Sequence, residues 1–268
     1  LRPRPGVEPS RAGSWRFRLR TRPVWRYLLV AVLIVAPTGA GLTGCSKAPV
    51  TRDQILGSTD ETGNWEAFVL DLSSSLTYLI TNDSGFDVDP AWPPDGARVA
   101  VASNRYDDFE LFVLDQDGSI IRQLTDNDFS DEQPAWSPDG KRIAFKTDRT
   151  GDVEIFVMRS DGTDVKQLTD ELGEDWQPAW SPDNRSLAFA SNRNGNWDIF
   201  VMRSDGTDVK QLTDDPGTDL LPVWSPDGQR LAFTSNRLSG LGVFLVDVAE
   251  GRARFTGQDG IPSDWRTR

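Results

Sequence analysis

The amino-acid sequence predicts an all-β protein, a five-bladed β-propeller built from four-stranded antiparallel blades. Three observations predict it. A Trp recurs every 44 residues, each unit holds four short strand signals separated by turns, and the two chain ends carry complementary parts of one further unit. A fixed period of this length is typical of repeat proteins, in which each unit buries its apolar faces only against its neighbours. The recurring residues are Trp92, Trp136, Trp180 and Trp224.

The unit that contains Trp136 shows how the strands are assigned. The Ser-Pro-Asp-Gly sequence after this Trp is a turn signal, because Pro presets φ and Gly accepts a positive φ. The third strand is apolar on both faces, with Ile155 and Val157 on one face and Phe156 and Met158 on the other. Such a strand belongs in a sheet packed between other sheets, as in a propeller blade. The expected strands are Pro134–Trp136, Arg142–Lys146, Glu154–Met158 and Val165–Thr169.

Partial units at the two chain ends predict how the ring closes. Four full units begin at Pro90, Pro134, Pro178 and Pro222, and Ile261–Trp265 matches only the opening strand of a unit. Segments before Pro90 match the later strands. We therefore expect the C-terminal strand to pair with the N-terminal partial blade as its innermost strand, which removes the exposed sheet edges. The N-terminal segments are Ile55–Gly57, Asn64–Val69 and Leu76–Thr81.

These motifs resemble the TolB-type propeller repeat, a relative of the WD-repeat class. The resemblance covers the chain from about Arg52 to the end, and it recurs four times in phase. TolB proteins carry six such blades and a separate N-terminal domain, so this chain departs from them and their role in envelope integrity is not carried over whole. The motifs are Pro134–Gly140, Ile143–Phe145, Ser191–Arg193, Asp198–Met202 and Gln211–Thr213.

The first 44 residues are typical of an export signal. Several Arg residues precede an apolar run at 27–36, which is too short to span a bilayer. Small residues then lead to Leu42-Thr43-Gly44-Cys45, which resembles a bacterial lipobox, in which the Cys is acylated and becomes the mature N-terminus. The alternative is an uncleaved signal anchor with an incidental thiol, but Cys45 is the only Cys of the chain and directly follows the small residues.

This interpretation predicts the domain organisation and the location. We expect a lipoprotein-type signal peptide at 1–44, a lipid-anchored linker at 45–51 and the propeller at 52–268, with Cys45 as the lipid attachment site. Acyl chains on this residue would anchor the protein stably to a membrane. The propeller would then face the extracytoplasmic side, towards the periplasm or at the cell surface. Ser46 rather than Asp follows the Cys, which favours the outer membrane in a double-membrane cell.

Composition excludes several classes of function. The chain contains no His, which excludes Ser-His-Asp and Cys-His catalysis and His-liganded zinc. It also lacks a phosphate-binding loop and a dinucleotide fingerprint, so we expect no cofactor other than Ca²⁺. Without the leader the net charge falls from −12 to −19, which disfavours nucleic acid and favours cations, basic proteins or uncharged ligands. A carboxylate-only glycosidase remains open, because two Asp or Glu suffice for that reaction.

An Asp stands three residues before the Pro of every unit. The loop that carries it enters the innermost strand at one mouth of the central channel. The loop between the second and third strands opens on the same face and carries Arg105, Arg149, Arg193 and Arg237. Two interpretations remain open: each Asp pairs with an Arg and holds adjacent loops together, or the Asp residues form a binding site for a cation or basic peptide. These residues are Asp87, Asp131, Asp175, Asp219 and Asp259.

The closing blade differs from the others in its charges. Where the other blades supply an Arg after the second strand, this blade has Asp60 and Glu61. Asp259 would then face two further carboxylates, and oxygen ligands of this kind suit Ca²⁺. Alternatively, the three side chains splay into solvent, where screening weakens their repulsion.

Aromatic residues on the same face complete the candidate site. Tyr106, Phe129 and Trp176 differ between units, which suits stacking on sugars or contact with a protein. Phe109 and Trp197, in the same region, are interpreted equally well as packing for the third strands. We expect a monomeric protein-interaction scaffold without enzymatic activity, whose partner is an envelope protein or a basic peptide. The alternative is a carbohydrate-binding module or a glycosidase.

Overall fold

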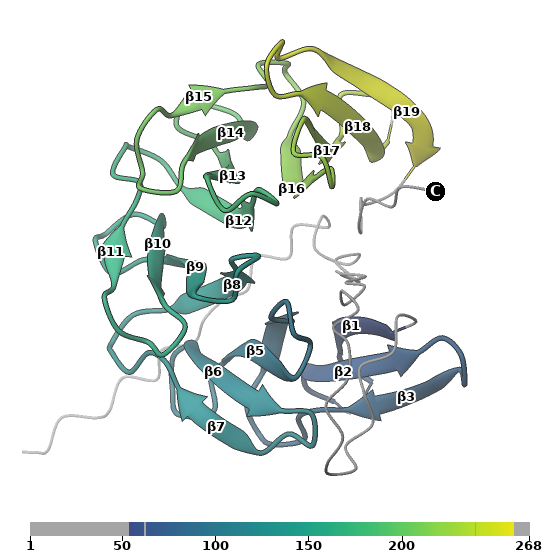
Figure 1. The fold of residues 1–268 in the computed structure, drawn as a ribbon, viewed down its shortest axis with the longest axis vertical. Coiled ribbons are helices and arrows are strands. Elements are labelled where there is room, and N and C mark those ends of the chain that lie inside the picture. The colour runs from purple at the N-terminus through teal and green to yellow at the C-terminus, as the bar shows by residue number, and fades with distance from the viewer. Residues whose placement is uncertain (1–53, 62, 239, 260–268) are drawn as a thin grey trace, which may run out of the picture.

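The computed structural model describes residues 54–61, 63–238 and 240–259, which form strands and turns. The strands make five antiparallel sheets that follow one another along the chain and stand side by side around a common centre (Figure 1). The prediction of an all-β, five-bladed propeller is thereby confirmed. Among the residues described, no helix is long and apolar enough to cross a membrane.

We number the blades 1 to 5 in chain order. Blades 2 to 5 have four strands each, with the first strand innermost, and blade 1 has three strands within the described residues. The expected closing strand at 261–265 and the expected lipid site at Cys45 both lie outside the described residues.

The strand bounds are as follows: blade 1, β1 (Gln54–Thr59), β2 (Glu66–Asp71) and β3 (Leu76–Leu79); blade 2, β4 (Asp87–Ala91), β5 (Arg98–Ser103), β6 (Glu110–Asp115) and β7 (Ile120–Gln123); blade 3, β8 (Asp131–Trp136), β9 (Arg142–Thr147), β10 (Glu154–Arg159) and β11 (Lys166–Gln167); blade 4, β12 (Asp175–Trp180), β13 (Ser186–Ser191), β14 (Asp198–Arg203) and β15 (Lys210–Gln211); blade 5, β16 (Asp219–Trp224), β17 (Arg230–Ser235), β18 (Gly242–Asp247) and β19 (Ala253–Asp259).

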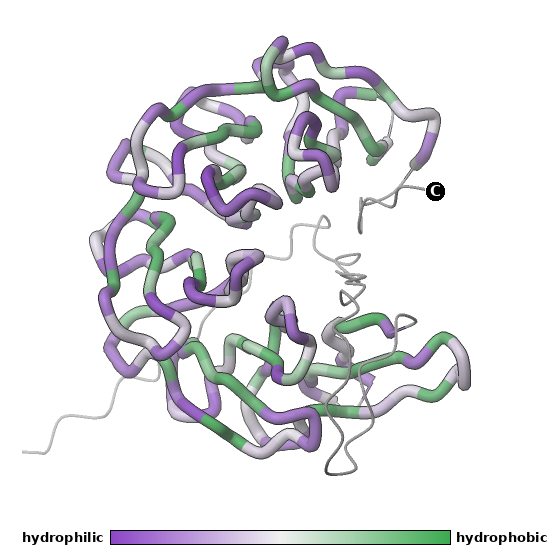
Figure 2. Tube along the Cα trace, in the orientation of Figure 1, coloured by the Kyte–Doolittle hydropathy of each residue, from purple (hydrophilic) through white to green (hydrophobic). Residues whose placement is uncertain are grey.

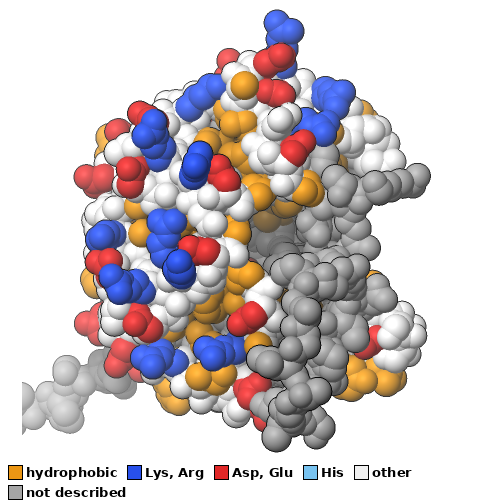
Figure 3. Space-filling model, viewed as in Figure 1, with side chains coloured by type: hydrophobic (Ala, Val, Ile, Leu, Met, Phe, Trp, Pro, Cys, Tyr) orange, Lys and Arg blue, Asp and Glu red, His pale blue; other side chains and the backbone are white. Residues whose placement is uncertain are grey.

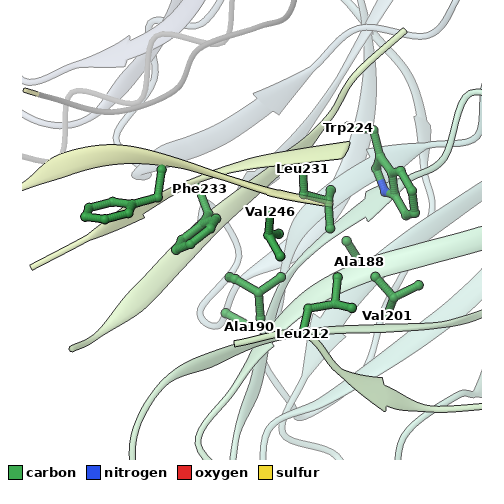
Figure 4. Close-up of a cluster of buried hydrophobic side chains, with 10 residues drawn as sticks. Ala188, Ala190, Val201, Leu212, Trp224, Leu231, Phe233 and Val246 are labelled. Carbon is green, nitrogen blue, oxygen red and sulfur yellow. The ribbon is translucent and has the colours of Figure 1, made fainter. Parts of the chain in front are cut away.

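The third strands of blades 2 to 4 are hydrophobic because each packs against both neighbouring blades. In β10, Phe156 and Met158 lie in a buried cluster with blade 2, whereas Ile155 and Val157 lie in another with blade 4. This two-faced packing was predicted from the alternation of the strand and is confirmed. Figure 2 shows the hydrophobic residues concentrated in the middle strands. Figure 4 shows the equivalent cluster between blades 4 and 5, where Leu212 faces residues of blade 5.

The repeated Trp residues occupy the junctions between blades. Trp180 and Trp224 are each 8% exposed, and each indole donates a hydrogen bond of 3.0 Å to a backbone carbonyl of the preceding blade, at Ala135 and Ala179. Trp136 is less buried than these two rings, since it is half-buried and its Nε1 has no acceptor among the described residues. The hydrogen bond that fixes the other two rings is therefore missing at this junction.

The Ser-Pro-Asp turns are built by their own side chains. In blade 3, the Ser137 hydroxyl donates to Asp139 Oδ1 at 2.7 Å, the same oxygen accepts from the Lys141 amide at 3.1 Å, and Gly140 has a φ of 68°. Matching bonds from Ser181 and Ser225 occur in blades 4 and 5. These aspartates are turn formers, as their repetition predicts.

The fourth strand of blade 3 is shorter than expected. The sequence predicts a strand over Val165–Thr169, but only Lys166 and Gln167 pair with β10. The reason is that the Thr169 side chain replaces a backbone partner, since its Oγ1 accepts the Ile155 amide at 2.9 Å. The ladder therefore ends before the chain reaches Thr169.

Candidate functional site

One Arg–Asp ion pair recurs at four blade junctions on one face of the propeller, where the loops after the second and fourth strands of each blade meet. We call this side the mouth face. Each innermost strand from β4 to β16 begins with an Asp whose side chain is at most 2% exposed, and the Arg of the adjacent loop binds it. The pairs and their shortest N–O distances are Arg105–Asp87 at 2.8 Å, Arg149–Asp131 at 2.8 Å, Arg193–Asp175 at 2.7 Å and Arg237–Asp219 at 2.6 Å.

Each Arg is also fixed by its own blade. Arg193 Nε donates to Ser191 Oγ at 2.9 Å, and its guanidinium lies 5.5 Å from the Phe189 ring and 5.0 Å from the Phe200 ring. The arrangement recurs at the other junctions with Ser or Thr as the acceptor. The Asp side chains therefore hold loops together, as one of the two sequence interpretations states, and they offer no exposed carboxylate to a ligand.

A further buried carboxyl adjoins each pair, and sequence reasoning missed it. It belongs to the first residue of the third strand and is at most 3% exposed. In blade 3, Thr169 Oγ1 donates to Glu154 while it accepts the Ile155 amide, so one hydroxyl serves both groups. The 44-residue spacing of these acids was the signal that could have revealed them. They are Glu66, Glu110, Glu154 and Asp198.

Burial makes these carboxyl groups weak acids. It raises the pKa of Glu110 and of Glu154 to about 7 and that of Asp198 to about 6, and the neighbouring Asp of the next blade adds to each shift. Burial likewise raises the pKa of Glu66. Blade 5 has Gly242 at this position, where the Phe255 ring lies 2.7 Å from the place that a Cβ would occupy. A buried acid beside an Arg–Asp pair is thus found at the junctions that follow blades 1 to 4.

These shifts predict that stability falls as the pH rises. A carboxyl whose folded pKa is raised contributes stability that is complete below its unfolded pKa and is lost as the pH rises through the folded pKa. We therefore expect the free energy of unfolding to fall by about 3 to 6 kcal/mol in total between about pH 5 and pH 8. Urea unfolding at the two pH values measures it.

The matched control for this pH dependence is the neutral variant Glu110→Gln/Glu154→Gln, which should flatten the dependence. The exposed turn aspartates do not interfere, because hydrogen bonds from neighbouring residues lower their pKa and confine their effect to more acidic solution. Equal stability of the natural protein at both pH values would contradict the expectation.

The candidate Ca²⁺ residues belong to blades 1 and 5. Asp259 is the last residue of the outer strand β19 and pairs in register with Gly242, so it does not share the position of the other four Asp residues. Asp60 and Glu61 are exposed in the turn after β1. The Asp259 side chain lies outside what the structure describes. In the described part of the chain, no three acidic, His or Cys residues are grouped to hold a metal ion.

The candidate aromatic residues divide into two kinds. Tyr106 and Phe129 are surface residues of the mouth face, 63% and 43% exposed. Trp176 is half-buried and lies 4.5 Å from the ring of Trp197, with Lys146 Nζ 5.2 Å from its centre. Trp176 therefore packs within the blades. A surface residue that the sequence analysis did not single out is Leu172, which is 84% exposed in a loop of the same face.

A second feature missed from the sequence links the innermost strands. A β-bulge in each of them gives Asp89, Gln133, Gln177 and Leu221 a positive φ. Gln133 Oε1 accepts the Gln177 amide at 2.8 Å, and Gln177 Oε1 accepts the Leu221 amide at 2.8 Å. This chain of bonds ends at Leu221, whose side chain has no acceptor. It ties blades 3 to 5 together at the centre.

Comparison with known proteins agrees with this architecture. The family model described as the TolB beta propeller domain matches residues 59–177 and 166–263, which is most of the chain. The chain belongs to the TolB β-propeller family. Among curated protein sequences no match is found.

Several solved structures resemble the chain in fold. The putative TolB from Agrobacterium tumefaciens is 25% identical, with a TM-score of 0.67, and the match covers 76% of each chain. TolB from Acinetobacter baumannii is 22% identical with a TM-score of 0.68, and the match covers 80% of this chain but 54% of that one. An oligogalacturonate lyase in complex with manganese is 14% identical with a TM-score of 0.58, covering 76% and 61%.

Figure 3 shows how charge is distributed on one face of this TolB-like propeller. Basic and acidic side chains alternate over the outer parts of the blades, and hydrophobic side chains follow the lines between them. Exposed ion pairs of this mixed kind include Arg203–Asp208 at 2.6 Å and Lys166–Asp164 at 3.4 Å. Such surface pairs contribute little to stability.

Proposed function

We propose that the protein is an exported, lipid-anchored propeller that acts as a protein-interaction scaffold in the cell envelope. A TolB-like propeller is in general a scaffold for protein interactions, and most such propellers are not enzymes, although some distant structural neighbours are. The buried carboxyl pairs give the glycosidase alternative no support, because they lie inside blade junctions instead of facing a cleft.

One observation carries the proposal. The mouth face exposes Tyr106, Phe129 and Leu172, and none of these large apolar side chains recurs in every unit. The position of Phe129, for example, is Gly85 in the preceding unit and Gly173 in the next. Residues that build every blade recur in every unit and these three do not, so their exposed surfaces are available to a partner. Exposed aromatic and aliphatic residues of this kind are typical of protein contact sites.

Affinity capture with matched variants tests the scaffold role. The tagged full-length protein would be cross-linked and solubilised from its own membranes, and the bound proteins compared with those of the variant Tyr106→Ser/Phe129→Ser/Leu172→Ser. The control variant Ile120→Ser/Val165→Ser/Val209→Ser also removes three exposed apolar side chains, but from the fourth strands or the residues directly before them. We expect one partner to be retained by the natural protein and the control but lost from the mouth-face variant. Equal retention by all three proteins would contradict the proposal.

The lipid anchor makes a separate prediction. Cys45→Ala removes the thiol that acylation requires, so the protein should leave the membrane fraction or accumulate with its leader uncleaved. Cell fractionation and the mass of the mature N-terminus measure this outcome, with Cys45→Ser as a second variant that keeps a side chain of similar size. Full membrane association of both variants would place the anchor elsewhere.

A further inference from the structure

The loops that join blades 2, 3 and 4 at the mouth face expose charge of one sign. We call loops 104–109, 126–130, 148–153 and 170–174 the acidic loop surface. Its basic side chains are Arg105 and Arg149, and both are held in ion pairs with buried Asp. The exposed charged residues of these loops are all carboxylates: Asp107, Asp126, Asp128, Asp148, Asp152, Asp170 and Glu171.

Several of these carboxylates have no structural task. Asp126, Asp128, Asp152 and Glu171 make no ion pair or hydrogen bond with another described residue, whereas a turn aspartate such as Asp161 accepts bonds from the Thr163 amide and hydroxyl. Like charges gathered without partners raise the free energy of the folded state through repulsion. Turn formation therefore does not account for them, and a positively charged partner would relieve the repulsion.

A pocket within this surface has the chemistry of a site for one long basic side chain. It is open to solvent and lies between the loop after β9 and the loop after β11. Carboxylates line it on several sides, and the apolar Leu172 stands at its edge, 84% exposed. A Lys or Arg buries its aliphatic stem along apolar surface and keeps its charged head among polar groups. The lining residues are Thr150, Asp152, Glu154, Asp170, Glu171 and Leu172.

We propose that the acidic loop surface binds a cationic, partly apolar protein segment. A Lys or Arg of the segment inserts between Asp152, Asp170 and Glu171, and its apolar residues contact Phe129 and Leu172. This proposal rests on the scaffold function proposed above and names the chemistry of the partner. Opposite charge steers such a segment to the surface and aligns it, and the apolar contacts slow its release.

A synthetic peptide of alternating Lys and Leu is the probe, and a Glu/Leu peptide of equal length is its control. Binding to the solubilised full-length protein would be followed by fluorescence anisotropy. The variant Asp126→Asn/Asp152→Asn/Asp170→Asn/Glu171→Gln neutralises the surface. The matched variant Asp95→Asn/Asp161→Asn/Asp205→Asn/Glu250→Gln removes the same charge from loops of the opposite face. The change in net charge is identical, so only its position differs.

We expect the natural protein to bind the Lys/Leu peptide and not the Glu/Leu peptide. The surface variant should bind it at least about tenfold more weakly, and the matched variant with unchanged affinity. The affinity should also fall as salt is raised from about 50 mM to about 500 mM. The single variant Glu171→Lys should also weaken binding of the Lys/Leu peptide. It keeps the test valid if the fourfold variant does not fold.

Three outcomes would overturn the inference: equal weakening by both fourfold variants, equal binding of the two peptides, or Ca²⁺ binding at these loops in place of the peptide. The capture experiment separates the two proposals. If the natural partner remains bound to the surface variant, the scaffold function stands and the cationic partner is refuted. If the natural protein captures no partner at all, the scaffold function itself fails.

Discussion

Replacing Trp180 with Ala should lower the free energy of unfolding by about 3 to 5 kcal/mol. The side chain is 8% exposed and packs into the cluster of Ile155, Val157 and Phe200. Its indole also donates to the Ala135 carbonyl at 3.0 Å. Truncation therefore removes buried apolar area and leaves a cavity between two blades, and that carbonyl loses its donor.

The chain supplies its own control for this prediction. Trp136 has the same place in its unit but is half-buried, and its Nε1 has no acceptor in the described structure. Trp136→Ala should therefore cost less than Trp180→Ala under the same conditions. Urea unfolding followed by fluorescence would measure both. If the two substitutions cost the same, the exposure and hydrogen bonding of the ring do not determine its contribution.

The blades were predictable because their signals are local and repeated. Ser-Pro-Asp turns and alternating apolar residues determine the strands within one unit. Because the pattern recurs four times in phase, it does not arise by chance. The Asp–Arg pairs could also be expected, since the loops that carry them open on one face. The sequence could not show whether these Asp residues are buried in ion pairs or exposed to a ligand. Both arrangements require the same residues at the same spacing.

Two parts of the site were not predicted correctly, and each has a physical reason. Glu110 and Glu154 are each the first residue of an otherwise apolar strand, next to a loop, where a carboxylate is expected to be exposed. Asp259 was aligned by counting back from Pro262, but that Pro follows Pro222 by 40 residues rather than 44. The shorter spacing places Asp259 within the outer strand β19, opposite Gly242.

Breaking one ion pair at the mouth face should cost about as much as removing a buried Trp. Arg149→Met keeps most of the side-chain volume but leaves Asp131, whose side chain is 0% exposed, without its 2.8 Å partner. An uncompensated buried charge costs about 3 to 5 kcal/mol. The double variant Asp131→Asn/Arg149→Met removes both charges and should recover part of this loss, because Asn still accepts a bond from Asn127 Nδ2, as Asp131 does at 2.8 Å.

A surface pair in the same blade gives the matched comparison. Arg159 and Asp164 lie 3.7 Å apart with side chains 66% and 47% exposed, so Arg159→Met should change the free energy of unfolding by less than about 1 kcal/mol. Urea unfolding of the four proteins would rank them as natural protein, Arg159→Met, double variant and Arg149→Met in order of falling stability. A double variant no more stable than Arg149→Met would show that lost packing against Phe145 and Phe156, not the unpaired Asp131, causes the destabilisation. In that case the mouth-face pairs would act mainly as packing elements between loops.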